Sequence, residues 1–151
     1  MLFRSEAWIQ VDPAHAKEAM EIVGNPVTDR GGGFRLYLDR AGVHFISGTG
    51  GVWKEAKTWG AHSGPQHPIE PGRWHHVAGT YDGSVFRVFI DGQLAGSSVP
   101  DMPLTKGKPD TGIGSFRDGL VLGFGGMVAE VNLHDKALPE AEIRQRANNA
   151  E

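Results

Sequence analysis

The chain has 151 residues, which is the size of a single domain, and it contains no Cys, so disulfides, thiolate zinc sites and cysteine nucleophiles are excluded. Apolar residues make up 39% of the sequence, enough for a hydrophobic core. The net charge of −3 gives no overall basic character for binding nucleic acid. No apolar run approaches the roughly 18 residues of a membrane span, and the first residues lack the pattern of a signal peptide.

Apolar and polar residues alternate with a period of two along most of the chain, which predicts short antiparallel strands with one buried face. Near the N-terminus, for example, Ala7, Ile9 and Val11 are separated by Trp8 and Gln10. We predict about ten strands, at residues 3–11, 19–25, 33–39, 42–48, 52–58, 73–82, 85–91, 93–98, 111–116 and 124–134. Many short strands with regular turn signals are typical of an all-β sandwich or jelly roll.

Turn signals agree with this interpretation. Asp82-Gly83 and Asp91-Gly92 each lie between two alternating runs, where Asp-Gly favours a two-residue hairpin turn because Gly accepts a positive φ. Residues 73–98 are therefore predicted to form a three-stranded meander. A further turn is expected at residues 39–42.

Three segments do not follow the alternation. Residues 14–20 have helical composition but are few. Residues 139–149 predict a terminal helix, because Pro occupies its first turn, acidic residues come early and arginines come late. Residues 47–72 form the longest irregular segment, and a long loop of this kind in a domain is usually functional or disordered.

Residues 72–96 contain Gly-Arg-Trp-His-His-Val-Ala-Gly-Thr-Tyr-Asp-Gly and, further on, Ile-Asp-Gly-Gln-Leu-Ala-Gly. This pattern resembles the signature of the laminin-G-like jelly rolls of the concanavalin A-like lectin/glucanase superfamily. Ordered motifs at residues 3–9, 112–115, 124–133 and 137–143 also resemble that family. The resemblance implies one domain over residues 1–151, built as a two-sheet antiparallel jelly-roll sandwich with a short C-terminal helix.

One departure from the family concerns a sheet edge. The family usually has a strand before the one at residues 3–11, and that strand normally lies beside the late strand at residues 124–134. Without it, the late strand would have an open edge, which proteins usually cover or pair. We therefore hypothesise that a second copy of the chain, or residues outside it, covers this edge.

A second departure concerns calcium. Ala129 stands where the family commonly has Asp, so one carboxylate that could serve a calcium ion is missing. Asp110, Asp118 and Asp135 are alternative ligands, but their spacing matches no calcium-binding loop. Calcium is a candidate cofactor, and no zinc-site spacing occurs among the seven His.

The first candidate ligand-binding residues are Trp53 and Trp59, which lie in the Gly-rich irregular segment with His62 and His67 nearby. Indole faces stack on the apolar faces of sugar rings, while imidazoles hydrogen-bond to hydroxyls. The alternative is that the loop folds back and both Trp side chains cover one end of the core.

A second set of candidates, Trp8, Tyr37, His44 and His75, falls on the more polar phases of predicted strands. One such phase would line the concave face of a curved sandwich, where members of the resembled family often bind glycans. The alternative is a half-exposed convex surface. His76 shares the phase of Trp74 and is interpreted as structural.

Catalytic patterns are weak. Glu6 and Glu130 are isolated acids on separate strands, whereas glycosidases need a carboxylate pair. No serine-hydrolase elbow occurs, and Tyr37, Tyr81, His44 and Arg87 leave only a remote lyase alternative.

We therefore predict a non-catalytic carbohydrate-binding module whose partner is a glycan or polysaccharide. The alternative is an assembly module that pairs through the open edge, for example as a homodimer; a polysaccharide lyase or hydrolase is remote. Nucleic acid and membrane are not expected partners, and only the family resemblance favours an extracellular or cell-surface location.

Overall fold

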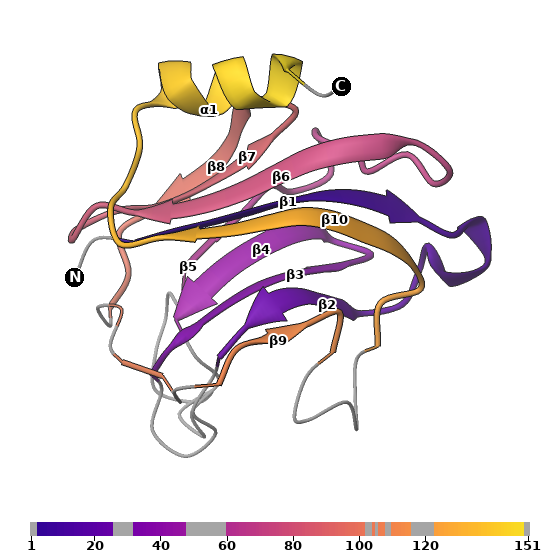
Figure 1. The fold of residues 1–151 in the computed structure, drawn as a ribbon, viewed down its shortest axis with the longest axis horizontal. Coiled ribbons are helices and arrows are strands. Elements are labelled where there is room, and N and C mark those ends of the chain that lie inside the picture. The colour runs from indigo at the N-terminus through magenta and orange to yellow at the C-terminus, as the bar shows by residue number, and fades with distance from the viewer. Residues whose placement is uncertain are drawn as a thin grey trace.

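The computed structural model is a sandwich of two antiparallel five-stranded sheets, with a helix lying across the outer face of one of them (Figure 1). The structure describes residues 3–25, 32–47, 60–101, 104, 106–107, 110–115 and 123–149. The predicted all-β jelly-roll class is confirmed. The strand predicted at residues 52–58 lies outside the described residues.

Sheet A has the order β10-β1-β6-β7-β8, and sheet B has the order β5-β4-β3-β2-β9. The strands of sheet A are β1 (Phe3–Val11), β6 (Trp74–Tyr81), β7 (Phe86–Ile90), β8 (Gln93–Ser98) and β10 (Gly126–His134). Those of sheet B are β2 (Met20–Gly24), β3 (Phe34–Asp39), β4 (Gly42–Ser47), β5 (Gly60–His62) and β9 (Gly112–Ile113). A 3-10 turn, η1 (Pro13–His15), and the helix α1 (Glu140–Asn148) complete the described elements.

The core fills the space between the two sheets, and its centre is aromatic. Phe45 of β4 lies with its ring centroid 5.6 Å from that of Phe86, across the sandwich, and 6.2 Å from that of Phe34. A Cβ at Gly79 of β6 would overlap the Phe45 ring, so the missing side chain lets the ring pack directly on the opposite sheet. The inward phase of β1 is the predicted one: Ala7, Ile9 and Val11 are buried.

Strand β10 departs from the expected simple alternation. A bulge shifts its register against β1 between Glu6 and Trp8, and Glu130 adopts a φ of 49° there. An extra residue in one strand exchanges its faces beyond that point. As a result Val128 and Val131 pack on the core, while Met127 is 50% exposed. The single alternation predicted across residues 127–134 is therefore wrong.

The two Asp-Gly pairs form different turns. Asp91 and Gly92 have φ of 51° and 77° and join β7 to β8 as a two-residue hairpin, as predicted. The connection at Asp82-Gly83 is longer than predicted, because β7 begins only at Phe86. The Asp82 carboxylate accepts hydrogen bonds from the backbone N–H groups of the next turn residues, at 2.9 and 3.0 Å, which stabilises the longer loop. The predicted three-stranded meander is confirmed by the order β6-β7-β8.

Helix α1 packs on the outer face of sheet A. Its one buried apolar residue, Ile143, lies in a small cluster with Ala78 and Phe89 of the sheet. Acidic residues occupy its first turn and Arg146 its last, which complements the helix dipole as predicted. Among the described residues, no helix is long and apolar enough to cross a membrane.

Gly92 couples the hairpin turn to the helix, because a Cβ there would lie 2.8 Å from Arg144 Cα and 3.2 Å from Ala147 Cβ. Gly72 has a similar φ of 80°, but a Cβ there would meet no atom within 4 Å. Gly72→Ala should therefore lower the free energy of unfolding by about 1 kcal/mol through backbone strain alone. Gly92→Ala should lower it by about 2–4 kcal/mol, since it adds a clash with α1. Urea denaturation measures both values, and equal losses would contradict the role of Gly92 in seating the helix.

Candidate functional site

A row of polar side chains crosses the outer face of sheet B. Glu21 of β2 pairs with Tyr37 of β3, Tyr37 pairs with His44 of β4, and His44 pairs with His62 of β5. Paired residues of adjacent strands lie on the same face of a sheet. Glu21, Tyr37, His44 and His62, with Arg35 beside them, are called the polar row below. Three of the candidates found in the sequence, Tyr37, His44 and His62, are thus brought together.

The rings of the row are stacked on one another. The Tyr37 and His44 rings are nearly parallel, 8° apart with centroids separated by 4.6 Å, and the His44 and His62 centroids lie 5.4 Å apart. The Arg35 guanidinium carbon lies 4.4 Å from the Tyr37 ring centroid. Because His44 and Arg35 both pack on the Tyr37 ring, little of its face is left for a ligand. The row offers hydrogen-bonding edges more than an aromatic platform.

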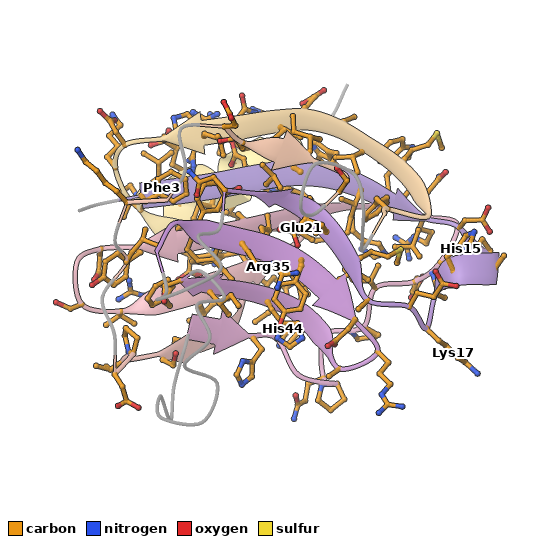
Figure 2. The ribbon with its side chains drawn as sticks, turned by 90° about the horizontal axis from the view of Figure 1, so that it is seen from below. Phe3, His15, Lys17, Glu21, Arg35 and His44 are labelled. Carbon is orange, nitrogen blue, oxygen red and sulfur yellow. The ribbon has the colours of Figure 1, made fainter. Side chains whose placement is uncertain are left out.

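The buried end of the row is an ion pair. Arg35 Nε and Nη2 donate to Glu21 Oε2 at 2.9 and 2.6 Å, and both side chains are almost fully buried. Figure 2 shows the two meeting over β2 and β3, with His44 next to them. Burial raises the pKa of Glu21 to about 7, and the hydrogen bond and charge of Arg35 offset only part of that effect.

Tyr37 and His44, the central side chains of the row, are each influenced by charged neighbours. Burial raises the pKa of Tyr37, the charges of Asp39 and Glu21 raise it further, and Arg35 opposes them, so the hydroxyl stays a hydrogen-bond donor. His44 Nε2 lies 2.9 Å from Asp39 Oδ1, which orients the imidazole. Asp39 also lines a cavity of about 250 Å³ at the adjoining end of the sandwich, and His67 lies in the wall of that cavity.

Trp8 lies on the other outer face of the molecule. It points away from the core of sheet A, half-buried, with its ring centroid 5.3 Å from that of His76. Trp8 and Tyr37 therefore do not share a face. Glu6 and Glu130 lie on separate strands, as interpreted from the sequence, and both line one pocket beside Trp8.

His75 lies elsewhere again. It pairs with the core-facing Ile9 and is buried, so its expected place on a polar strand phase is wrong. Its Nε2 accepts the Glu70 N–H at 3.0 Å, and its Nδ1 lies 2.8 Å from Asp91 Oδ2. With both ring nitrogens engaged, His75 joins the loop before β6 to the β7–β8 turn.

Trp53 and Trp59 lie outside the described residues, so their predicted role stays a prediction. Within the described ranges, no group of three or more His, Asp or Glu side chains is arranged to hold a metal ion. Sequence reasoning missed Glu21, Arg35 and Asp39 as site residues. Arg35 and Asp39 share the strand phase of Tyr37, which is a usable signal, but Glu21 joins them only through the register of β2.

Fold and row together define a jelly-roll β-sandwich with a polar outer face. A family model described as the concanavalin A-like lectin/glucanases superfamily matches residues 5–144. The chain belongs to this superfamily, which confirms the resemblance noted from its motifs. No curated protein matches the chain.

Three solved structures illustrate the likeness. A candidate carbohydrate-binding protein from Bacteroides ovatus is 23% identical, with a TM-score of 0.66 over 95% of this chain and 40% of its own. Domain 4 of AbnA, an extracellular arabinanase of Geobacillus stearothermophilus, was solved with arabinotriose. It is 17% identical, with a TM-score of 0.69, and the match covers 96% of this chain and 66% of its own. The CBM40 domain of a Ruminococcus gnavus sialidase, bound to α2,3-sialyllactose, is 15% identical, with a TM-score of 0.67. The match covers 97% of this chain and 82% of its own. The chain spans less than two-thirds of the first two proteins, and identities this low show the fold alone.

The raised pKa of Glu21 predicts a stability that falls as pH rises. Below about pH 4.5 the carboxyl is protonated in both the folded and the unfolded chain; between about 4.5 and 7 only the folded chain retains the proton. Glu21→Gln is neutral throughout, so its stability relative to the parent should increase across this window by up to about 3 kcal/mol and then level off. Thermal or urea unfolding from pH 4 to 8 measures the difference. A variant that instead loses stability relative to the parent as pH rises would mean that the Arg35 pair outweighs burial.

Proposed function

We propose that the chain is a non-catalytic carbohydrate-binding module and that its glycan site is the outer face of sheet B. The observation that carries this proposal is the polar row, which presents a hydroxyl and two imidazoles in register across neighbouring strands. Strands lie about 4.8 Å apart, so the row spaces its hydrogen-bonding groups on the scale of the hydroxyls along a sugar chain. The buried Glu21–Arg35 pair holds the Tyr37 edge in place.

The similar structures support this choice of ligand class. One is a candidate carbohydrate-binding protein, and two were solved with bound saccharides, arabinotriose and sialyllactose. A shallow face of this kind gives modest affinity for each site, and repeated sites would raise it through avidity. The same proposal includes an extracellular location, because that is where the module would find a glycan polymer.

Trp53 and Trp59 complete the proposed site. Trp59 directly precedes Gly60, the first residue of β5, and β5 carries His62 of the polar row. Because the Tyr37 ring is already packed by its neighbours, the stacking surface that sugars favour has to come from other aromatic side chains. Calcium stays a candidate cofactor of the proposed site. Its ligands would be oxygens other than the Asp carboxylate that Ala129 replaces.

The charges argue for binding rather than turnover. A glycosidase needs a general acid that keeps its proton near neutral pH and that reaches the glycosidic bond. Glu21 has a pKa of about 7, but its side chain is fully buried beneath the polar row. Burial alone would raise the pKa of Glu6, but the hydrogen bond from His76 and the charges of Arg4 and Arg146 outweigh it and hold the pKa below its ordinary value. A lyase would need an ionisable Tyr37, whose pKa is raised instead.

Tyr37→Phe should weaken glycan binding about fivefold to tenfold, because it removes one hydroxyl hydrogen bond and keeps the stacked ring. Tyr81→Phe is the matched control: Tyr81 is the only other Tyr, and its hydroxyl donates to Gly83 O on the far side of the core. The control should lose stability and retain affinity. A glycan array with calcium and with chelator identifies the ligand, and isothermal titration measures each variant.

Further variants divide the site. His62→Ala should weaken binding with the fold intact, since this side chain is exposed, and Trp53→Ala and Trp59→Ala should abolish it. Loss on chelation would make calcium part of the site. A blank array for the folded protein, or turnover of any polysaccharide on it, would overturn the proposal.

The assembly alternative has one observation in its favour. Strand β10 is an edge of sheet A and exposes Met127 and Leu133. If a second copy pairs there, light scattering will detect a concentration-dependent dimer, and Met127→Lys with Leu133→Lys will convert it to monomer. A monomer at all concentrations would exclude this function for the edge.

A further inference from the structure

The cavity of about 250 Å³ that Asp39 and His67 line lies at the end of the sandwich where β1 ends and β3 turns into β4. It is called the end cavity below, and this end of the molecule is on the right in Figure 1. Sites for drug-sized ligands measure about 300–1,000 Å³. The end cavity is smaller than these and has the scale of one small ring.

The innermost lining of the end cavity is apolar. It comes from Val11 of β1 and Leu38 of β3, both buried in the core, with Ala16 and Ile69 packed against the same core at the sides. A floor of this kind accepts the carbon–hydrogen face of a ring and leaves the polar groups of the ring to the rim. Because the core closes the floor, a chain that enters the cavity ends there.

The rim of the cavity is polar and open to solvent. Asp39 Oδ1 accepts the Ala41 N–H at 2.7 Å and lies 2.9 Å from His44 Nε2, whereas its Oδ2 has no hydrogen bond to any described residue. Arg40 is exposed and His67 is half-buried, and neither has an ion pair or hydrogen bond within the described part of the chain. One acid and one base offset each other, so the rim suits a neutral ligand that both donates and accepts hydrogen bonds.

The outer wall of the cavity is held in place by hydrogen bonds at both of its ends. Ser63 N donates to Val43 O at 2.9 Å and Val43 N donates to Ser63 Oγ at 3.0 Å, which joins the start of the wall to β4. At the other end the Gly72 N–H donates to Val11 O at 2.8 Å. Two residues of the wall between these ends are Pro, which restricts its backbone. A wall fixed in the free protein loses little entropy on binding.

The end cavity is continuous with the polar row. Arg35, Tyr37 and Asp39 follow one another on the outward-facing positions of β3, so this strand leads from the row to the rim. On the next strand the His44 imidazole contacts Asp39. Gly42 is paired with Asp39 on the same face and has no side chain to block the path between row and cavity. One ligand can therefore contact both.

We propose that the end cavity binds the terminal sugar of a neutral glycan whose following units lie along the polar row, an inference that rests on the function proposed above. The ring packs its apolar face on Val11 and Leu38. One hydroxyl donates to Asp39 Oδ2, and Arg40 donates to a second ring substituent. Since the core closes the cavity, the module recognises the ends of glycan chains rather than their interiors.

The glycan array gives the first test. The glycans that bind should share one uncharged terminal sugar and differ in their interior units. Binding to glycans that share an interior unit and differ at their ends would overturn the proposal. A requirement for a charged terminal sugar, either a uronic acid or an amino sugar, would also overturn it.

A direct test is a two-dimensional ¹H–¹⁵N NMR titration with neutral monosaccharides. The probes are D-glucose, D-galactose, D-mannose, D-xylose, L-arabinose, L-fucose and N-acetyl-D-glucosamine. At least one of them should cause saturable shifts of the Ala41, Gly42 and Gly64 amides, because these residues line the cavity. No saturable shift at these amides with any of the seven sugars would contradict a terminal-sugar site.

Matched variants assign the site by isothermal titration with an array glycan. Arg40→Ala should weaken binding about tenfold, because it removes a hydrogen bond from a charged donor. Arg73→Ala, which removes an exposed Arg outside the cavity wall, should leave the affinity unchanged. His67→Ala should weaken binding about threefold, and His15→Ala, an exposed His outside the wall, should not.

Tyr37→Phe distinguishes failure of the end cavity from failure of the sheet B site. If Tyr37→Phe weakens binding while Arg40→Ala and His67→Ala do not, the polar row stands as the glycan site and the end cavity is excluded. A blank array together with no monosaccharide shifts overturns both proposals. Loss of affinity in all three variants, with both control variants unaffected, supports both.

Discussion

The buried carboxylate of Glu6 is the interaction on which the helix side of the molecule depends. It joins Arg4 on its own strand to Arg146 of α1, and His76 of β6 and His134 of β10 lie 3.5 and 3.8 Å from its oxygens. Burying one charge is costly unless several partners compensate it, and here four elements supply them. The same contacts therefore seat the helix, tie three strands together and create the wall of a pocket.

Sheet B contains the opposite case. Glu21 is also buried, but among the described residues its carboxylate accepts hydrogen bonds only from Arg35, and the two carboxyls shift in opposite directions: the pKa of Glu6 falls and that of Glu21 rises. Glu6 has more compensating groups than Glu21, and Glu21 is the more deeply buried of the two. One outer face is thus fixed by an ionic cluster that lowers the pKa of its buried carboxyl. The other is built around a group that changes protonation near neutral pH.

Most strands were predictable because alternation and turn chemistry are local properties: β1 and β8 have the expected bounds, and the Asp91-Gly92 turn has the expected positive φ values. The bulge at Glu130 could not be predicted, because one extra residue in a strand does not change the composition of the segment. Nothing in the alternation shows that the outward-facing Arg4 and Arg35 are buried, because their burial depends on the packing of α1 and the pairing of β2. Tyr37, His44 and His62 were each identifiable, but their alignment is a matter of register between strands.

The outward-facing side chains of β1 and β3 point in opposite directions, because the two sheets pack face to face around the core (Figure 1). The polar row and the pocket beside Trp8 consequently face away from each other across the thickness of the core. The two faces therefore cannot bind the same short segment of a polymer. A ligand bound on the outer face of sheet B would therefore leave the outer face of sheet A, with α1, free to contact a second molecule.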